Sequence, residues 1–183
     1  MNDERTRPQT AAEARAEVEA RREATKAARA AELAERFGET LPGKGIIATS
    51  WFVTAAFVVV TVPAVIDPDR FIGAFFVVSL VIFFLACALF AIDIVLAAAR
   101  SRDDAMGIGG LFFLAGCAPR TAQVHLMAAL AVQVVVALVA AAVHPFTPLA
   151  FGTLVPMVGL GFSGLWAVRH GLFPARVGVR QSS

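Results

Sequence analysis

Four long apolar runs, separated by short polar stretches, dominate the chain after residue 44. Each run reaches the roughly 20 residues that an α-helix needs to cross about 30 Å of hydrocarbon. The pattern therefore predicts an all-α membrane protein with four transmembrane helices. The expected spans are 46–66, 71–99, 121–143 and 149–168.

The links between these runs differ in length. Residues 67–70 and 144–148 leave room only for tight turns, so the spans are expected to form two helical hairpins within a transmembrane domain of residues 45–170. The central link contains a shorter apolar stretch, 106–117, which has four glycines and is too brief to span a membrane. This stretch is expected either to lie in the interface or to re-enter the membrane from one side.

Residues 1–44 have the opposite pattern and form a charged arm. Nine of the 16 basic residues and nine of the 14 acidic residues lie here. Residues 10–37 are rich in Ala, Glu and Arg, which favour a helix, with Thr10 as the candidate N-cap and Gly38 as the stop. Alanines at a 4-3-4-3 spacing form a narrow seam: Ala20, Ala24, Ala27, Ala31 and Ala34. The arm is either a solvated helix held by i,i+4 ion pairs or a partner in a coiled-coil contact.

Composition supports the membrane assignment and excludes other classes. The chain is 58% hydrophobic, with a mean hydropathy of +0.72, far above that of a soluble domain. The formal net charge is only +2, and the signs are balanced in the arm, so nucleic acid is not an expected partner. Cys87 and Cys117 form no spaced disulfide or zinc framework and are expected to be free thiols.

Basic residues predict the orientation. The arm, the 100–120 link and the tail of residues 171–183 contain several basic residues. In the two tight turns, Arg70 is the only Lys or Arg. Because Lys and Arg concentrate in cytoplasmic loops, both termini are expected in the cytoplasm and the protein in the cytoplasmic membrane. Trp51 and Trp166 would then both fall near the cytoplasmic interface, where indole rings are favoured.

The fourth run contains residues 159–164, GLGFSG, which match the GxGxxG pattern of dinucleotide-binding loops. Such a loop follows a strand and opens a helix, whereas this match lies inside an apolar run. We therefore expect no cofactor. Gly159, Ser163 and Ala167 are four residues apart and predict a small-residue strip for close helix packing, with a kink at Pro156 one turn earlier.

With GIGGLFFLAGCAPR at 107–120 and PFTPLAFGTLVPMVGLGFSGLWAVRHGLFPAR at 145–176, the chain resembles a group of small actinobacterial integral membrane proteins of no assigned activity. The resemblance covers roughly the second half of the chain. It implies a membrane location and this topology, and it supplies no catalytic or binding residues.

Polar residues inside the spans are the candidate functional residues. Asp93 is the only acidic residue in an apolar run, and an intramembrane charge is a functional candidate because it costs free energy. On the third span, His125 and Gln133 share a face. Asp93, His125 and Gln133 are therefore a candidate polar cluster, in which Asp93 and His125 either pair for proton-linked chemistry or merely orient the bundle by interhelical hydrogen bonds.

Catalysis finds little support in the sequence. The spans contain no paired carboxylates, and no serine or cysteine has a recognisable base at motif spacing. Cys117 and His125 are too few for a metal site. The expected function is a non-enzymatic assembly or interaction partner in the lipid bilayer, acting with itself or with another membrane protein. The alternative is an oligomeric transporter or channel subunit with a polar path near Asp93, His125 and Gln133.

Overall fold

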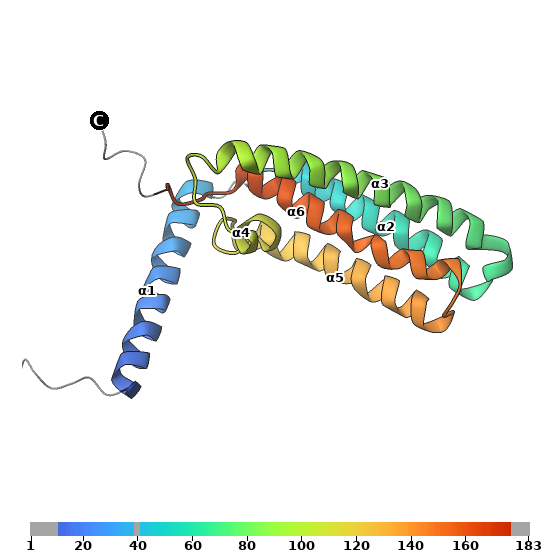
Figure 1. The fold of residues 1–183 in the computed structure, drawn as a ribbon, viewed down its shortest axis with the longest axis horizontal. Helices are drawn as coiled ribbons and strands as arrows, with labels where there is room; N and C mark the ends of the chain where they lie inside the picture. Colours follow the sequence, from blue (N-terminus) through green and yellow to red (C-terminus); the bar gives the residue numbers. More distant parts are fainter. Residues whose placement is uncertain (1–10, 39–40, 177–183) are drawn as a thin grey trace, which may run out of the picture.

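A computed structural model describes residues 11–38 and 41–176 of the chain. Within these residues it contains α1 (Ala11–Phe37), α2 (Lys44–Ile66), α3 (Pro68–Arg100), α4 (Ile108–Phe113), α5 (Arg120–Val143), the 3-10 helix η1 (Pro148–Leu154) and α6 (Pro156–His170) (Figure 1). The predicted all-α fold is confirmed, and four helical segments are long and apolar enough to cross a membrane. Thr10 and the tail beyond residue 176 lie outside the described residues.

The charged arm forms the single helix α1, which leaves the end of the bundle at a steep angle to the other long helices (Figure 1). Gly38 follows it with a φ of +49°, a left-handed conformation that glycine adopts without a steric cost. Leu33 is the buried residue of α1. An i,i+4 ion pair joins Arg21 to Glu17 at 2.9 Å on its exposed surface.

The four membrane-length segments follow one another as two antiparallel hairpins. Asp67 alone separates α2 from α3, and residues 144–147 separate α5 from η1. The helices extend past the apolar runs. In α3, Pro68 is the first residue, a position where the missing backbone N–H of proline removes no helix hydrogen bond. At the same end of the bundle, the His144 ring nitrogen Nε2 lies 2.9 Å from the carbonyl oxygen of Val65 and links the two turns.

The fourth segment is not one continuous α-helix. Residues 148–154 are 3-10 helical, and α6 begins only at Pro156. Because proline has no backbone N–H, the α-helical bond from position 156 to Gly152 is missing, and the N–H of Val155 bonds to the Gly152 carbonyl instead at 3.1 Å. The kink expected near Pro156 is therefore a change of helix type.

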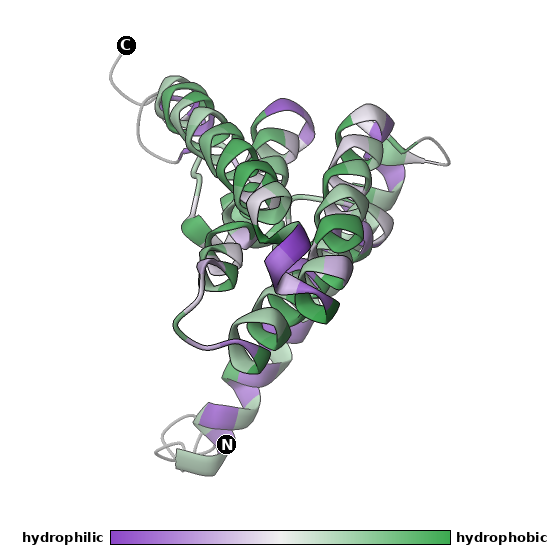
Figure 2. Ribbon diagram, turned by 90° about the vertical axis from the view of Figure 1, so that its right-hand side faces the viewer, coloured by the Kyte–Doolittle hydropathy of each residue, from purple (hydrophilic) through white to green (hydrophobic). Residues whose placement is uncertain are grey.

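The fourth segment is also the most enclosed. Buried residues make up 61% of its apolar window, compared with 28–33% in the other three, and α6 packs against α2, α3, α4 and α5. The outer surfaces of α2, α3 and α5 expose large apolar side chains such as Phe52, Val81 and Val135. Figure 2 shows that hydrophobic residues predominate along the helices of the bundle. A bundle with such a surface is a multi-pass membrane protein.

The central link folds back onto the bundle. Its helix α4 packs against α6, and Phe112 stacks on Phe90 of α3 with ring centroids 5.2 Å apart. Leu114 ends α4 with a φ of 59° and is completely buried. The six residues of α4 are far fewer than a membrane crossing requires.

The two tryptophans differ in a way that the sequence did not predict. Trp51 is partly exposed, as expected of an interfacial ring, whereas Trp166 is completely buried. The Trp166 indole Nε1 donates a hydrogen bond to the carbonyl oxygen of Pro42 at 3.0 Å, and its ring lies against Phe37. Phe37 and Pro42 cover this ring, so Trp166 is enclosed by protein at the end of the bundle next to α1.

Candidate functional site

The glycines of residues 159–164 lie within α6 and face three neighbouring helices. A Cβ on Gly159 would lie 2.7 Å from Gln133 Oε1 of α5, and one on Gly161 would lie 2.9 Å from Leu89 of α3. A Cβ on Gly164 would lie 2.3 Å from Asp93 Oδ2. Each position leaves no room for a side chain. The GxGxxG match therefore occupies helix contacts rather than a loop that opens a helix.

The predicted packing residues Gly159, Ser163 and Ala167 are all buried. The Ser163 hydroxyl donates to the carbonyl oxygen of Gly159 at 3.0 Å, within the same helix. This internal bond satisfies the hydroxyl without reaching a neighbour, so the strip presents little more than backbone to the adjoining helices.

Gln133 is completely buried and links two spans. Its amide Nε2 donates to the Thr54 hydroxyl of α2 at 2.7 Å, and the Thr54 hydroxyl in turn donates to the carbonyl oxygen of Ser50 at 2.8 Å. The amide oxygen Oε1 of Gln133 has no hydrogen-bond partner and faces Gly159. The arrangement is an interhelical hydrogen bond with one free acceptor.

Asp93 is the most unusual polar residue of the bundle. It is completely buried, and neither carboxyl oxygen has a hydrogen-bond partner in the described part of the chain. It lies against Gly164 of α6, which Phe112 of α4 also approaches. A buried polar group without a partner costs free energy, so Asp93 meets the physical criterion for an intramembrane functional residue.

The structure does not bring the three candidate polar residues together. His125 is exposed on α5, whereas Asp93 and Gln133 are buried. The suggested pairing of Asp93 with His125 is corrected, because the Asp93 carboxyl makes no hydrogen bond. The reason is rotational: the buried face of α5 contains Leu126, Ala129 and Gln133, and His125 lies one position away from that face.

Charged side chains do gather at the end of the bundle next to α1. We call this region the junction; it consists of residues 25–38 at the end of α1, residues 100–119 and residues 171–176. Arg100 is its central residue. Its guanidinium donates to the carbonyl oxygens of Val168 at 2.5 Å and Gly171 at 3.2 Å, and it pairs with Asp104 at 2.7 Å. Arg100 thus satisfies carbonyl groups at the C-terminal end of α6.

Arg29 attaches α1 to the same region. Its Nε donates to the carbonyl oxygen of Gly116 at 2.9 Å, and its NH2 group donates to that of Leu172 at 2.5 Å. The segment after α6 is held further by a backbone bond from Leu172 to Cys117 and by an antiparallel bridge between Asp104 and Ala175. Three parts of the chain that are distant in sequence are therefore joined through backbone carbonyls.

Cys117 lies inside the junction and is a buried free thiol. Its Sγ donates to the carbonyl oxygen of Gly110 at 3.1 Å. Burial raises the pKa of this thiol to about 11, although Arg29 and Arg100 act in the opposite direction. The thiol is therefore protonated near neutral pH. Within the described residues, no three His, Cys, Asp or Glu side chains are placed to hold a metal ion.

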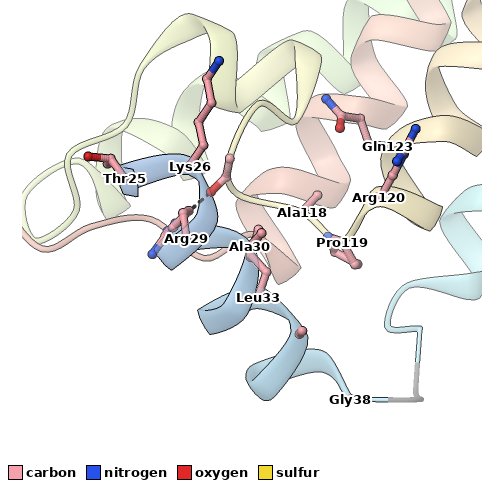
Figure 3. A pocket seen from close by; sticks show the side chains of 12 residues that line it. Thr25, Lys26, Arg29, Ala30, Leu33, Gly38, Ala118, Pro119, Arg120 and Gln123 are labelled. Atoms are coloured by element: carbon pink, nitrogen blue, oxygen red, sulfur yellow. Dashed lines mark hydrogen bonds between the residues drawn. The ribbon is translucent and has the colours of Figure 1, made fainter. Parts of the chain in front are cut away.

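A groove of about 680 Å³ separates α1 from the start of α5 (Figure 3). Lys26 and Arg29 lie on the α1 side, and Arg120 and Gln123 lie on the opposite side. The Gln123 amide donates to the carbonyl oxygen of Phe113 at 3.0 Å. We call this hollow the basic groove. It contains none of the candidate polar residues.

In the sequence, Arg29, Arg100 and Arg120 belong to the basic segments that predict the orientation. Their clustering was not apparent, because residues 29, 100 and 120 belong to three separate elements. The one available signal was that each basic segment flanks the same predicted side of the membrane. That signal places charges at one end of a bundle but does not specify contacts.

Comparison with known proteins gives no further assignment. No protein family, curated protein or solved structure matches this chain.

Proposed function

We propose that this protein is a non-enzymatic assembly or interaction partner in the cytoplasmic membrane, with both termini in the cytoplasm and α1 as its contact element. The observation that carries the proposal is the exposed alanine seam of α1. All five seam alanines are exposed, and of these five only Ala34 lines the basic groove. A small-residue seam permits close approach of another helix.

The attachment of α1 supports this role. Arg29 bonds to the backbone carbonyl groups of Gly116 and Leu172, and Leu33 is buried. The C-terminal half of α1 is thereby held in place, while its N-terminal half remains exposed. A partner that binds a pre-positioned helix loses less entropy than one that must order a free chain.

The distribution of arginines supports the orientation. Arg100, Arg102, Arg120 and Arg169 flank the helix ends beside α1, whereas Arg70 flanks the opposite turn. Single cysteines at Asp69 and Arg102, introduced without Cys87 and Cys117, test this orientation. An impermeant maleimide added to intact cells is expected to label position 69 and not position 102. The reverse pattern overturns it.

Site-specific photo-crosslinking tests the interaction proposal. A photoreactive residue at Ala24 or Ala31 is expected to yield a crosslinked second protein in native membranes, either another copy of this chain or a different chain. The matched control is Arg22, which is also exposed on α1 but lies outside the seam. Equal crosslinking from Ala24 and Arg22, or none from the seam, contradicts the proposal.

One observation favours a transporter subunit as the second candidate. The Asp93 carboxyl is buried in a span without a hydrogen-bond partner, as residues that bind protons or cations in transporters often are. Uptake by reconstituted vesicles tests it: an imposed proton gradient should collapse faster with the wild type than with Asp93→Asn. Equal rates in wild type, Asp93→Asn and empty vesicles exclude this candidate.

A further inference from the structure

The basic groove lies where a membrane span begins. One wall is the segment from Thr25 to Gly38 at the end of α1, and the other includes Pro119 and Arg120 at the start of α5. Because α5 is one of the four helices long enough to cross a membrane, its first turn lies at the level of the lipid headgroups. This placement holds whichever side of the membrane α1 occupies.

The charge of the groove is of one sign. Among the described residues, its lining includes Lys26, Arg29 and Arg120 and no acidic residue. Arg29 is engaged by backbone carbonyl groups and by Glu32. Lys26 and Arg120 form no ion pair with any residue in the described ranges, so their charges are available to an anion.

The start of α5 adds backbone donors to the same wall. No side chain caps this helix, and its first turn contains no acidic residue. The first N–H groups of an α-helix have no partner within the helix and favour an anion. The uncapped helix end reinforces the two available cations, Lys26 and Arg120.

Apolar surface continues from the groove along the span. Leu33 and Ala118 are buried beside it, and Pro119 contributes to its lining. Val124, one turn beyond Arg120, is 55% exposed on the outside of α5. A ligand with a phosphate at one end and hydrocarbon at the other therefore matches the order of these surfaces along the membrane normal.

We propose that the basic groove binds an anionic phospholipid, with the phosphodiester between Lys26 and Arg120 and the acyl chains along α5. Arg29 is a positioning residue in this site, because it holds α1 at the distance that keeps the groove open. The bound lipid would fill the space between α1 and the start of α5 and contact both. This inference goes beyond the proposed function and is independent of which protein contacts the alanine seam.

Native mass spectrometry of the full chain in detergent tests the proposal. Titration with dioleoylphosphatidylglycerol is expected to give a first binding event about tenfold tighter than with dioleoylphosphatidylcholine. The double variant Lys26→Gln/Arg120→Gln is expected to lose that preference. The charge-matched control Arg22→Gln/Arg102→Gln removes two exposed basic residues outside the groove and is expected to retain it.

Several results overturn the proposal. These are equal binding of the two lipids by the wild type, an equal loss in the groove and control variants, and binding of inorganic phosphate as tight as that of phosphatidylglycerol. The last result would assign the groove to a soluble anion. If the double variant does not fold, Lys26→Gln alone is sufficient, since Lys26 is exposed and an unchanged preference in that variant also contradicts the site.

Discussion

The two ends of the bundle are held together in different ways. At the end away from α1, the connections are one residue between α2 and α3 and residues 144–147 between α5 and η1, and the His144 ring, 2.9 Å from the Val65 carbonyl oxygen, links the two turns. At the α1 end, the link between α3 and α5 spans residues 101–119, and α1 and the segment after α6 meet it there. Arg29, Arg100 and backbone bonds hold these pieces.

The difference follows from chain connectivity. A short turn fixes two helix ends covalently and loses little entropy when the protein folds, whereas a long link must be ordered by contacts. Arginine suits this task because one guanidinium donates to several carbonyl groups in fixed directions. The junction is therefore expected to be more sensitive to single substitutions than the opposite end, and five measurements test this comparison.

The largest loss of stability is expected for a substitution in the middle of the bundle, and the losses at the two ends are compared with it. Gly159→Leu should lower the free energy of unfolding by about 3 kcal/mol, because even a Cβ would lie 2.7 Å from Gln133 Oε1 and 3.1 Å from Leu130. Unfolding in detergent with increasing SDS measures it. The control Leu160→Ile changes a half-buried neighbour and should have a small effect. Equal stability of Gly159→Leu and wild type would show that α5 and α6 do not meet closely.

The next largest effect is expected at the junction. Arg100→Ala should cost about 2 kcal/mol, since it leaves the Val168 and Gly171 carbonyl groups and Asp104 without their donor. Arg100→Lys should recover only part of that loss. The control is Arg70→Ala at the opposite end, where the exposed guanidinium lies over the Phe71 ring. If both alanine variants unfold alike, the contrast between the ends fails.

Gly43 connects α1 to the bundle and tests the junction through the backbone. Its φ is 70°, and a Cβ there would lie 2.6 Å from Trp166 Nε1. Gly43→Ala should therefore cost about 1–2 kcal/mol and displace the buried indole. Gly45→Ala is the matched control, since nothing lies within 4 Å of its Cβ position. Tryptophan fluorescence should shift to longer wavelength in the first variant and stay unchanged in the second.

His144→Ala probes the short-turn end directly. It removes the contact with the Val65 carbonyl and should cost about 1 kcal/mol, less than Arg100→Ala, because the turns themselves keep α2, α3, α5 and η1 in place. The same SDS titration measures it. A loss larger than that of Arg100→Ala would reverse the proposed order of the two ends.

The last effect depends on pH and is absent near neutral pH, where the Cys117 thiol is protonated in both the folded and the unfolded chain. Burial raises the pKa of the Cys117 thiol from its ordinary value of 9.0 to about 11. The Cys117 thiol ionises at a lower pH in the unfolded chain than in the folded protein. Its contribution to the stability of the folded protein is therefore complete below pH 9 and is lost as the pH rises toward 11. In a Cys87→Ala background, maleimide should label folded Cys117 far more slowly at pH 8 than the SDS-unfolded chain. Equal labelling rates would show that the junction does not enclose this thiol.

Periodicity and length were sufficient for the coarse architecture. Four runs of membrane length give four helical segments, and Gly38 ends α1 where a stop signal was expected. These features are local, because a helix needs only apolar length, suitable propensity and a terminating residue. The 3-10 start of the fourth segment was only partly anticipated, since Pro156 indicates a disturbance but not its form.

The candidate polar cluster shows where such reasoning fails. Helical spacing placed His125 and Gln133 on a shared face, yet only Gln133 is buried. Each four-residue step turns a side chain slightly around the helix axis, so His125 and Gln133 do not point in the same direction. Which of the two is buried depends on where the neighbouring helices pack. Asp93 likewise faces Gly164 because of how α3 and α6 meet.

The sequence by itself determined that this is an all-α membrane protein with four segments long and apolar enough to span a membrane, a charged helical arm and glycines suited to helix packing, because hydropathy, propensity and spacing act within one segment. Only the tertiary structure decided that α6 is the enclosed helix, that Trp166 is covered and that Arg29, Arg100 and Arg120 assemble beside a groove. Those outcomes depend on contacts between segments tens of residues apart. In lipid, where apolar burial does not distinguish one helix neighbour from another, close packing and hydrogen bonds select those contacts.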